Sequence, residues 1–108
     1  MADGNAADVI VRDNAEKHRF EADLGDSVAV AEYILTPTKI IFSHTEVPPA
    51  HEGKGVGSIL IKAGLTSART RGLKVIPTCP FFASYMKRHP ETHDLLDESY
   101  RKIFGLDA

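Results

Sequence analysis

Apolar and polar residues alternate through much of the first half of the chain, a pattern typical of strands with one buried face. Between residues 18 and 24, Phe20, Ala22 and Leu24 occupy every second position, with charged residues between them. Similar segments give expected strands at 9–11, 18–24, 28–35 and 39–47. Turn residues separate them at Asp13-Asn14, Gly25-Asp26 and Thr36-Pro37-Thr38. The first half therefore predicts an antiparallel meander of about four strands.

The period of the pattern changes in the second half of the chain. From Val56 onward apolar residues recur at helical spacing, and Gly72 supplies a C-terminal cap for the predicted helix. A short strand is expected at 73–76, apolar enough for the interior of a sheet, and a second helix at 81–89, ended by Pro90. The tail has a weaker helical pattern. A meander followed by a glycine-rich loop, a helix, a strand and a helix predicts an α+β (mixed α/β) fold.

Composition bounds the class of protein. The 108 residues predict one domain, 1–108, and residues 1–7 are small and polar enough to be disordered. With 43% hydrophobic and 26% charged residues, the chain has the composition of a soluble globular protein. Its single cysteine, Cys79, excludes an internal disulfide and a cysteine-based zinc site. No apolar run approaches the ~20 residues of a membrane span, and the start does not resemble a signal peptide. The expected location is cytoplasmic, or cytosol and nucleus in a eukaryote.

Charge is distributed unevenly along the chain. Residues 1–50 hold nine acids and four bases, a balance of −5, whereas residues 51–90 hold one acid and seven bases, a balance of +6. The basic block begins at the glycine-rich loop, which favours an anionic ligand there, although solvated Lys and Arg on helix faces would give the same count. Because the aromatic residues do not interleave with the bases, we expect no direct nucleic-acid binding.

The loop contains Gly53, Gly55 and Gly57 just before the predicted helix. A P-loop needs G-x-x-x-x-G-K-S/T and a dinucleotide fingerprint needs G-x-G-x-x-G, and neither spacing occurs here. Two interpretations stay open. The loop is either a glycine-rich strand-to-helix turn, or a run of free backbone N–H groups that a pyrophosphate can approach at the positive end of the helix dipole.

At this point the sequence resembles a known family. Glu52-Gly53-Lys54-Gly55-Val56-Gly57 is similar to the Gln/Arg-x-x-Gly-x-Gly/Ala pyrophosphate loop of the GNAT superfamily of acetyl-CoA-dependent N-acetyltransferases. It departs from that loop in having Glu52 at the Gln/Arg position. A closer resemblance is to the small single-domain members, described as minimal acetyltransferases. Its motifs are Ser43-His44-Thr45-Glu46-Val47-Pro48, Ile76-Pro77-Thr78-Cys79-Pro80 and Arg88-His89-Pro90, and it covers roughly residues 9 to 100.

The resemblance implies a GNAT-like fold and a cofactor, acetyl-CoA or coenzyme A, lying between the fourth and fifth strands. Backbone groups from Thr45 to Val47 would pair with the pantetheine arm like an added strand. Amides of the loop and the first helical turn would hold the pyrophosphate. The cofactor-binding residues implied in this way are Thr45, Val47, Gly53, Lys54, Gly55, Val56, Gly57, Ser58 and Tyr85. Tyr85 roughly matches the tyrosine that protonates the leaving thiolate in larger members, but packing against Phe81 and Phe82 explains it equally well.

Cys79 and His44 are the candidate catalytic residues. Pro80 favours a helix start, which puts Cys79 at an N-cap where a thiolate is stabilised and its pKa lowered. Cys79 is then a nucleophile forming an acetyl-cysteine, a general base, or simply a buried small residue. His44, two residues after Phe42, is either a packed or surface residue of its strand, or forms a Cys–His pair with Cys79 on a neighbouring strand, as its match to the family motif implies. Glu46, on the same face as His44, is an alternative proton acceptor. The remaining histidines show no metal spacing, so no metal site is expected.

The sequence thus predicts an acetyl-CoA-dependent N-acetyltransferase acting on a primary amine. The acceptor is a peptide or protein lysine, an N-terminus or a small amine, reached through an open site because the early strands leave no room for acceptor-side helices. The expected mechanism is direct transfer, with an acetyl-cysteine intermediate as the variant. The alternative is a non-catalytic acyl-CoA-binding or protein-interaction module. No membrane partner is expected, and the expected state is a monomer or weak dimer.

Overall fold

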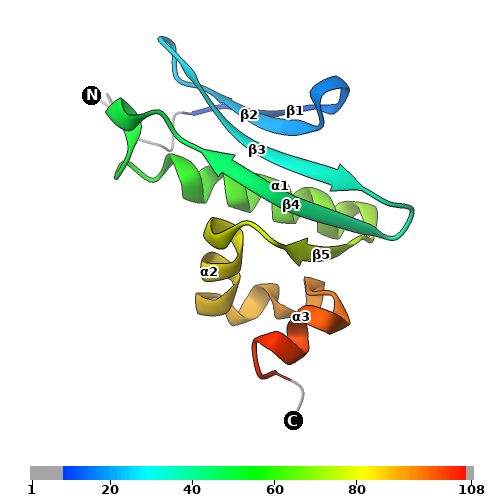
Figure 1. The fold of residues 1–108 in the computed structure, drawn as a ribbon. Helices are drawn as coiled ribbons and strands as arrows, with labels where there is room; N and C mark the ends of the chain where they lie inside the picture. The colour runs from blue at the N-terminus through cyan, green and yellow to red at the C-terminus, as the bar shows by residue number, and fades with distance from the viewer. Residues whose placement is uncertain (1–8, 107–108) are drawn as a thin grey trace.

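The computed structural model describes residues 9–106 (Figure 1). The expectation of disorder for residues 1–7 lies outside the described residues. The strands are β1 (Val11–Asn14), β2 (Arg19–Asp23), β3 (Val28–Leu35), β4 (Lys39–Glu46) and β5 (Lys74–Pro77). The α-helices are α1 (Val56–Arg71), α2 (Pro80–Arg88) and α3 (Glu98–Ile103). Short 3-10 helices are η2 (Ala15–Lys17), η3 (Pro49–His51) and η4 (Pro90–Leu95).

The strands form one sheet in the order β1-β2-β3-β4-β5. Strands β1 to β4 pair antiparallel, and β5 lies parallel to β4 after the α1 crossover. Helix α1 runs along one face of this sheet, and α2 and α3 gather beside β5 (Figure 1). The predicted four-strand meander, the loop-helix-strand-helix order and the α+β class are confirmed.

The first strand is shifted relative to the prediction. It begins at Val11 and includes Asp13 and Asn14, which were expected to end it. The reason is that their side chains have partners in the fold: Tyr33 Oη donates to Asp13 Oδ1 (2.6 Å), and Asn14 Nδ2 donates to Glu21 Oε2 (3.1 Å). The turn comes instead at η2.

A β-bulge interrupts β4. Glu32 pairs with His44, but the next residue of β3, Tyr33, pairs with Phe42, so Ser43 is the extra residue. Side chains alternate between faces along a strand, and the extra residue shifts that alternation. Ile40 and Phe42 are buried before the bulge, and Thr45 is buried after it.

The core lies between the sheet and the two longer helices. Phe42 of β4 stacks on Phe82 of α2, with ring centroids 4.0 Å apart and an interplanar angle of 7°. A Cβ on Gly64 of α1 would come within 2.9 Å of the Phe42 ring and 3.4 Å of the Phe82 ring. The helices α1 and α2 therefore pack on the same face of the sheet, next to each other.

Strand β5 is at the edge of the sheet, which corrects the expectation of an interior position. Its apolar character has another cause. The chain after η4 covers its outer side, where Leu96 forms an isolated bridge with Val75 and the Asp97 N–H donates to the Val75 carbonyl oxygen (2.9 Å). Both flanks of β5 are thus occupied although only one of them belongs to the sheet.

Candidate functional site

A cavity of about 600 Å³ opens where β4 ends, between the glycine-rich loop, the first turn of α1 and the first turn of α2. Its volume is in the range of small-molecule and cofactor sites. The described residues that line it are Thr45, Glu46, Val47, His51, Glu52, Gly53, Gly55, Val56, Gly57, Ser58 and Phe81.

The cavity exists because β4 and β5 separate. Their pairing ends with Phe42 and Pro77, and a last hydrogen bond joins the Cys79 N–H to the Phe42 carbonyl oxygen (2.9 Å). β4 continues to Glu46 beyond this point. Its last residues pair with β3 on one side, and the cavity lies on the other, so a ligand can reach this edge of the strand.

Glycines of the loop, which have only backbone atoms, line the cavity. Gly53 and Gly55 have φ of 80° and 84°, in the left-handed region that glycine adopts without strain. Gly55 is the N-cap of α1, so no side chain caps the helix there, and its first turn holds no acidic residue. The first amides of a helix have no partner within the helix, and the helix dipole adds positive potential at this end. The arrangement suits a phosphate group.

The structure brings most of the sequence-predicted cofactor residues to this cavity. Those that line it are Thr45, Val47, Gly53, Gly55, Val56, Gly57 and Ser58. Lys54 lies in the same loop with an exposed side chain, outside the described lining. Tyr85 is not brought to it. Tyr85 is buried, stacks on His89 with ring centroids 3.9 Å apart, and lines a separate depression between α1 and η4.

Cys79 is the N-cap of α2, as expected, but its side chain does not cap the helix. Its Sγ lies 3.2 Å from Thr45 Oγ1, and the residue is 3% exposed. Thr45 faces the cavity and Cys79 lies behind it, outside the described lining.

The expected Cys79–His44 pair is not formed. The bulge at Ser43 turns His44 to the exposed face of the sheet, and Thr45 takes the position facing Cys79. His44 Nε2 lies instead 3.4 Å from Glu46 Oε1, and both side chains are more than half exposed. His44 and Glu46 thus share a face, as predicted, and Glu46 reaches the cavity rim.

Two bases of the basic block, Arg69 and Arg71, pair with acids away from the loop, whereas Lys54 lies in it. Arg69 forms a two-pronged ion pair with Asp94 (2.7 and 3.1 Å), and Arg71 pairs with Asp13 (2.9 Å). These ion pairs connect α1 to η4 and to β1. The described lining of the cavity includes no Lys or Arg side chain.

Sequence reasoning missed His51 and Phe81 as cavity residues. Phe81 is 55% exposed although large and apolar, whereas Phe82 beside it is fully buried. His51 Nε2 lies 2.9 Å from Asp26 Oδ1 in the β2–β3 turn, 25 residues away. The sequence could have indicated an exposed Phe81. Two consecutive residues of one helix cannot both face the core of the protein, so one of the two phenylalanines has to lie at the surface. No local signal joins His51 to Asp26.

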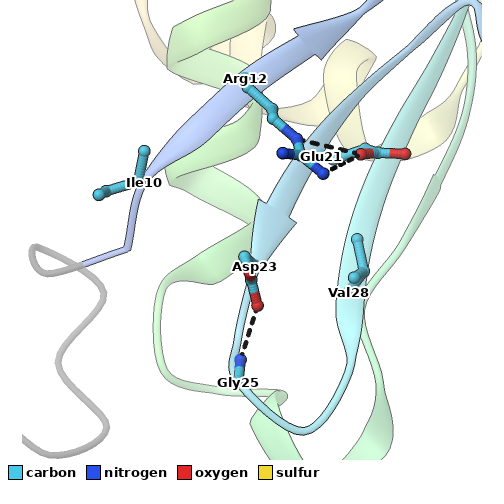
Figure 2. A pocket seen from close by; sticks show the side chains of 6 residues that line it. All are labelled: Ile10, Arg12, Glu21, Asp23, Gly25 and Val28. Carbon is cyan, nitrogen blue, oxygen red and sulfur yellow. Dashed lines mark hydrogen bonds and ion pairs between the residues drawn. The ribbon is translucent and has the colours of Figure 1, made fainter.

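Figure 2 shows another cavity, of about 430 Å³, on the outer face of β1, β2 and β3. Its central carboxylate, Glu21, accepts hydrogen bonds from Arg19 (2.7 Å), Asn14 (3.1 Å) and Arg12 (3.4 Å). The hydrogen bonds from Arg19 and Asn14 lower the pKa of Glu21. Because side chains of the strands already occupy this carboxylate, it is not free to bind a ligand. We therefore place the candidate site at the cavity of about 600 Å³.

Metal-binding groups and membrane-spanning helices are both absent from residues 9–106. Within this range, no three His, Cys, Asp or Glu side chains are grouped so as to hold a metal ion. The helices described there are all too short or too polar to cross a membrane.

The chain is similar in sequence to known proteins. The model of a family described as GCN5-related N-acetyl-transferase matches residues 19–95. The chain is also similar to Protein NATD1 of Gallus gallus and of Mus musculus, each 36% identical over 63 residues that cover 57% of this chain and 57% of the relative. Protein NATD1 of Homo sapiens is 36% identical over 63 residues, covering 57% of this chain and 56% of the relative. The matched segment thus spans little more than half the length of these relatives.

Proposed function

Because the chain belongs to the GCN5-related N-acetyltransferase family, we propose that it transfers the acetyl group of acetyl-CoA to a primary amine. The observation that carries this proposal is the cavity at the fork between β4 and β5. One wall of it is the uncapped start of α1, and another is the last part of β4.

The cavity fits the parts of coenzyme A. Amides from Gly55 to Ser58 suit the diphosphate, as anion sites at helix starts do. The free edge of β4 from Thr45 to Val47 suits the two amides of the pantetheine arm, which would add like a short strand. The exposed ring of Phe81 offers an apolar contact across the cavity. We leave Tyr85 out of the proposed site because it lines a different depression.

Acetyl-CoA supplies an acyl group already activated as a thioester, so the chain has to orient the amine and remove its proton. We assign the proton acceptor to Glu46, with His44 beside it at 3.4 Å as the group that takes the proton on to solvent. Both are exposed, which leaves them accessible to an amine that arrives from outside. The transfer forms a C–N bond and breaks the C–S bond, and the thiolate that leaves takes up a proton.

Direct attack by the amine fits the position of Cys79 better than an acetyl-cysteine does. A nucleophile has to reach the thioester carbon, but Cys79 is 3% exposed and lies behind Thr45. We therefore propose that the Cys79–Thr45 contact supports β4 at the floor of the site. The acceptor is a lysine of an exposed peptide or protein, or a small amine, because no described helix covers the His44 and Glu46 side of the sheet (Figure 1).

A second candidate function is a module that binds acyl-CoA without turning it over. The specific observation in its favour is the missing Cys79–His44 pair, together with the burial of Cys79. Both candidates include cofactor binding, so the test has to separate binding from transfer.

The test measures CoA binding by calorimetry, and CoA release and amine acetylation by mass spectrometry, with a pool of peptides and small amines. We expect acetylated amine and free CoA in equal amounts. Glu46→Gln should lower the transfer rate by about 100-fold or more while CoA still binds, since general bases contribute 10²- to 10⁴-fold. Binding without CoA release above the buffer rate would establish the binding module. Absence of CoA binding would remove both candidates.

A further inference from the structure

The cavity proposed to receive a diphosphate has an unusual set of charges. Its described lining includes two carboxylates, Glu46 and Glu52, and His51 is its one basic side chain. Glu52 occupies the position where the family resemblance calls for Gln or Arg. Backbone amides alone would therefore have to hold an anion next to two acids, unless His51 contributes positive charge.

His51 is held in place from outside the loop. Its Nε2 lies 2.9 Å from Asp26 Oδ1, which also accepts a hydrogen bond from Ser27 Oγ (3.0 Å). The His51 side chain is 19% exposed, whereas that of Asp26 is 70% exposed. The ring is therefore fixed between the β2–β3 turn and the cavity, and the hydrogen bond from His51 lowers the pKa of Asp26.

This contact determines which ring nitrogen carries the proton of the neutral ring. An ionised carboxylate only accepts hydrogen bonds, so the proton of the neutral ring lies on Nε2. The second proton then goes to Nδ1, and it turns the ring into a cation with a second donor. Imidazole is the side chain whose ordinary charge change falls between pH 5 and 8.

We propose that His51, oriented by Asp26, is a diphosphate-binding residue of this site, and that binding of the cofactor is accompanied by proton uptake at His51. The inference rests on the proposed function, because it concerns the same cavity. It predicts that the affinity for the diphosphate falls as pH rises through the neutral range.

The charged groups that contact His51 or line the same cavity are acidic. Asp26 of the β2–β3 turn contacts the ring, and Glu46 at the end of β4 and Glu52 in the loop line the cavity with it. Lys54 is the basic residue of the loop, and its side chain is exposed. The start of α1 contributes a partial positive charge that attracts the same phosphate group.

The experiment measures the Kd of dephospho-CoA by calorimetry from pH 5.5 to 8.5, in buffers of different ionisation enthalpy. Dephospho-CoA is the probe because the phosphate monoester of CoA itself titrates near pH 6, whereas a diphosphate diester does not titrate in this range. Pantetheine, which has no phosphate, is the ligand control. His89→Gln is the matched variant, because His89 also pairs with a carboxylate (Glu91, 3.2 Å) but lies outside the cavity.

We expect wild type to bind dephospho-CoA about tenfold more tightly at pH 5.5 than at pH 8, the usual worth of a hydrogen bond to a charged group. His51→Gln should bind equally at all these pH values and without proton uptake. Asp26→Asn, on an exposed turn, should bind dephospho-CoA more weakly than wild type, because His51 loses the partner that orients it. Pantetheine binding should not depend on pH, and His89→Gln should behave like wild type.

A wild-type pH profile in folded His51→Gln protein would overturn the inference, as would an equal pH effect on pantetheine. Thermal melting establishes that the variant is folded. If neither dephospho-CoA nor CoA binds at any pH, the proposed function fails and this inference with it. If both bind but His51→Gln makes no difference, the proposed function stands and only the role of His51 is wrong.

Discussion

Gly57 differs from the two glycines before it, because nothing in its backbone requires a glycine. Gly53 and Gly55 have positive φ, and any side chain there would be strained. Gly57 lies in the first turn of α1 without a positive φ, and a Cβ at this position would meet only Val47 Cγ2 at 3.9 Å. The fold would accept an alanine, whereas a ligand seated on the amides would not have the same room.

We therefore predict that Gly57→Ala weakens CoA binding by about tenfold, the loss of roughly one charge-assisted hydrogen bond. The melting temperature should stay the same or rise, since alanine is up to about 1 kcal/mol better than glycine inside a helix. Calorimetry and thermal melting give the two values. Thr70→Ala, exposed near the other end of α1, is the control for helix propensity alone. Unchanged affinity in Gly57→Ala would argue against a ligand on these amides.

Asp97 is the other residue whose surroundings predict a measurable effect. Its Oδ2 accepts hydrogen bonds from Ser99 Oγ (2.6 Å) and the Ser99 N–H (3.2 Å), and its Oδ1 lies 2.9 Å from Lys39 Nζ. The hydrogen bonds from Ser99 and then Lys39 lower the pKa of Asp97 from 3.8 to about 2. Because the folded state holds the ionised form, the stabilisation is complete above about pH 4 and is lost as pH falls towards 2.

Asp97→Asn should lower the free energy of unfolding by about 2 kcal/mol at pH 7, the value that such a pKa difference implies. Asparagine still caps a helix start, so the loss reports the charge rather than the cap. Urea unfolding at pH 7 and at pH 2.5 measures it, and the difference between variant and wild type should shrink at the lower pH. A difference that is the same at both pH values would mean that the charge of Asp97 does not stabilise the fold.

At the scale of elements, Gly64 of α1 lies next to the rings of Phe42 in β4 and Phe82 in α2. A Cβ at Gly64 would lie 2.9 Å from Cε1 and Cζ of Phe42 and 3.4 Å from Cε2 of Phe82. Both rings are fully buried and stacked on each other, so neither can move aside without disturbing the core. The close approach of α1 to β4 depends on this missing side chain.

Gly64→Ala should therefore destabilise the protein, in contrast to Gly57→Ala in the same helix. The gain in helix propensity is at most about 1 kcal/mol, and overpacking a buried core costs about 1–3 kcal/mol. We expect a net loss in the free energy of unfolding of up to about 2 kcal/mol, measured by urea unfolding. If Gly64→Ala were more stable than wild type, the packing of α1 on Phe42 would have to be looser than it is here.

At the scale of the whole molecule, the sequence predicted the elements better than their relations. The pattern placed β3 at Val28–Leu35 and the Gly72 cap of α1 correctly, because local alternation and helical spacing determine them. The predicted interior position of β5 was wrong, because burial by the chain after η4 resembles burial inside a sheet. The pattern of apolar residues along a strand shows that the strand is buried, but it does not show which other segment buries it.

The site shows the same limit. Glycine spacing located the loop, but the bulge at Ser43 reversed the faces of β4 and brought Thr45 to Cys79 in place of His44. A bulge is visible only from the pairing of two strands. The contact of His51 with Asp26 joins residues 25 positions apart, and it forms only after the β2–β3 turn has met the loop.

Cys79 offers a test that involves the whole molecule, because it is the one cysteine of the chain and is 3% exposed. A buried thiol reacts only when the structure around it opens. Alkylation by iodoacetamide, a neutral reagent, should be at least about 100-fold slower in native buffer than in concentrated urea. If the opening is global, CoA at 100 times its Kd should slow the reaction by about another 100-fold, since binding then stabilises the folded state by about 2.7 kcal/mol.

Mass spectrometry of the alkylated protein gives these rates, and Thr45→Ala provides a local comparison. Removing the Thr45 hydroxyl opens the side of Cys79 that faces the cavity, so this variant should react faster than wild type and CoA should still protect it. A native rate equal to the rate in urea would mean that the thiol is accessible in the folded protein. An acetyl-cysteine intermediate would then be possible, and the burial of Cys79 would no longer favour direct transfer.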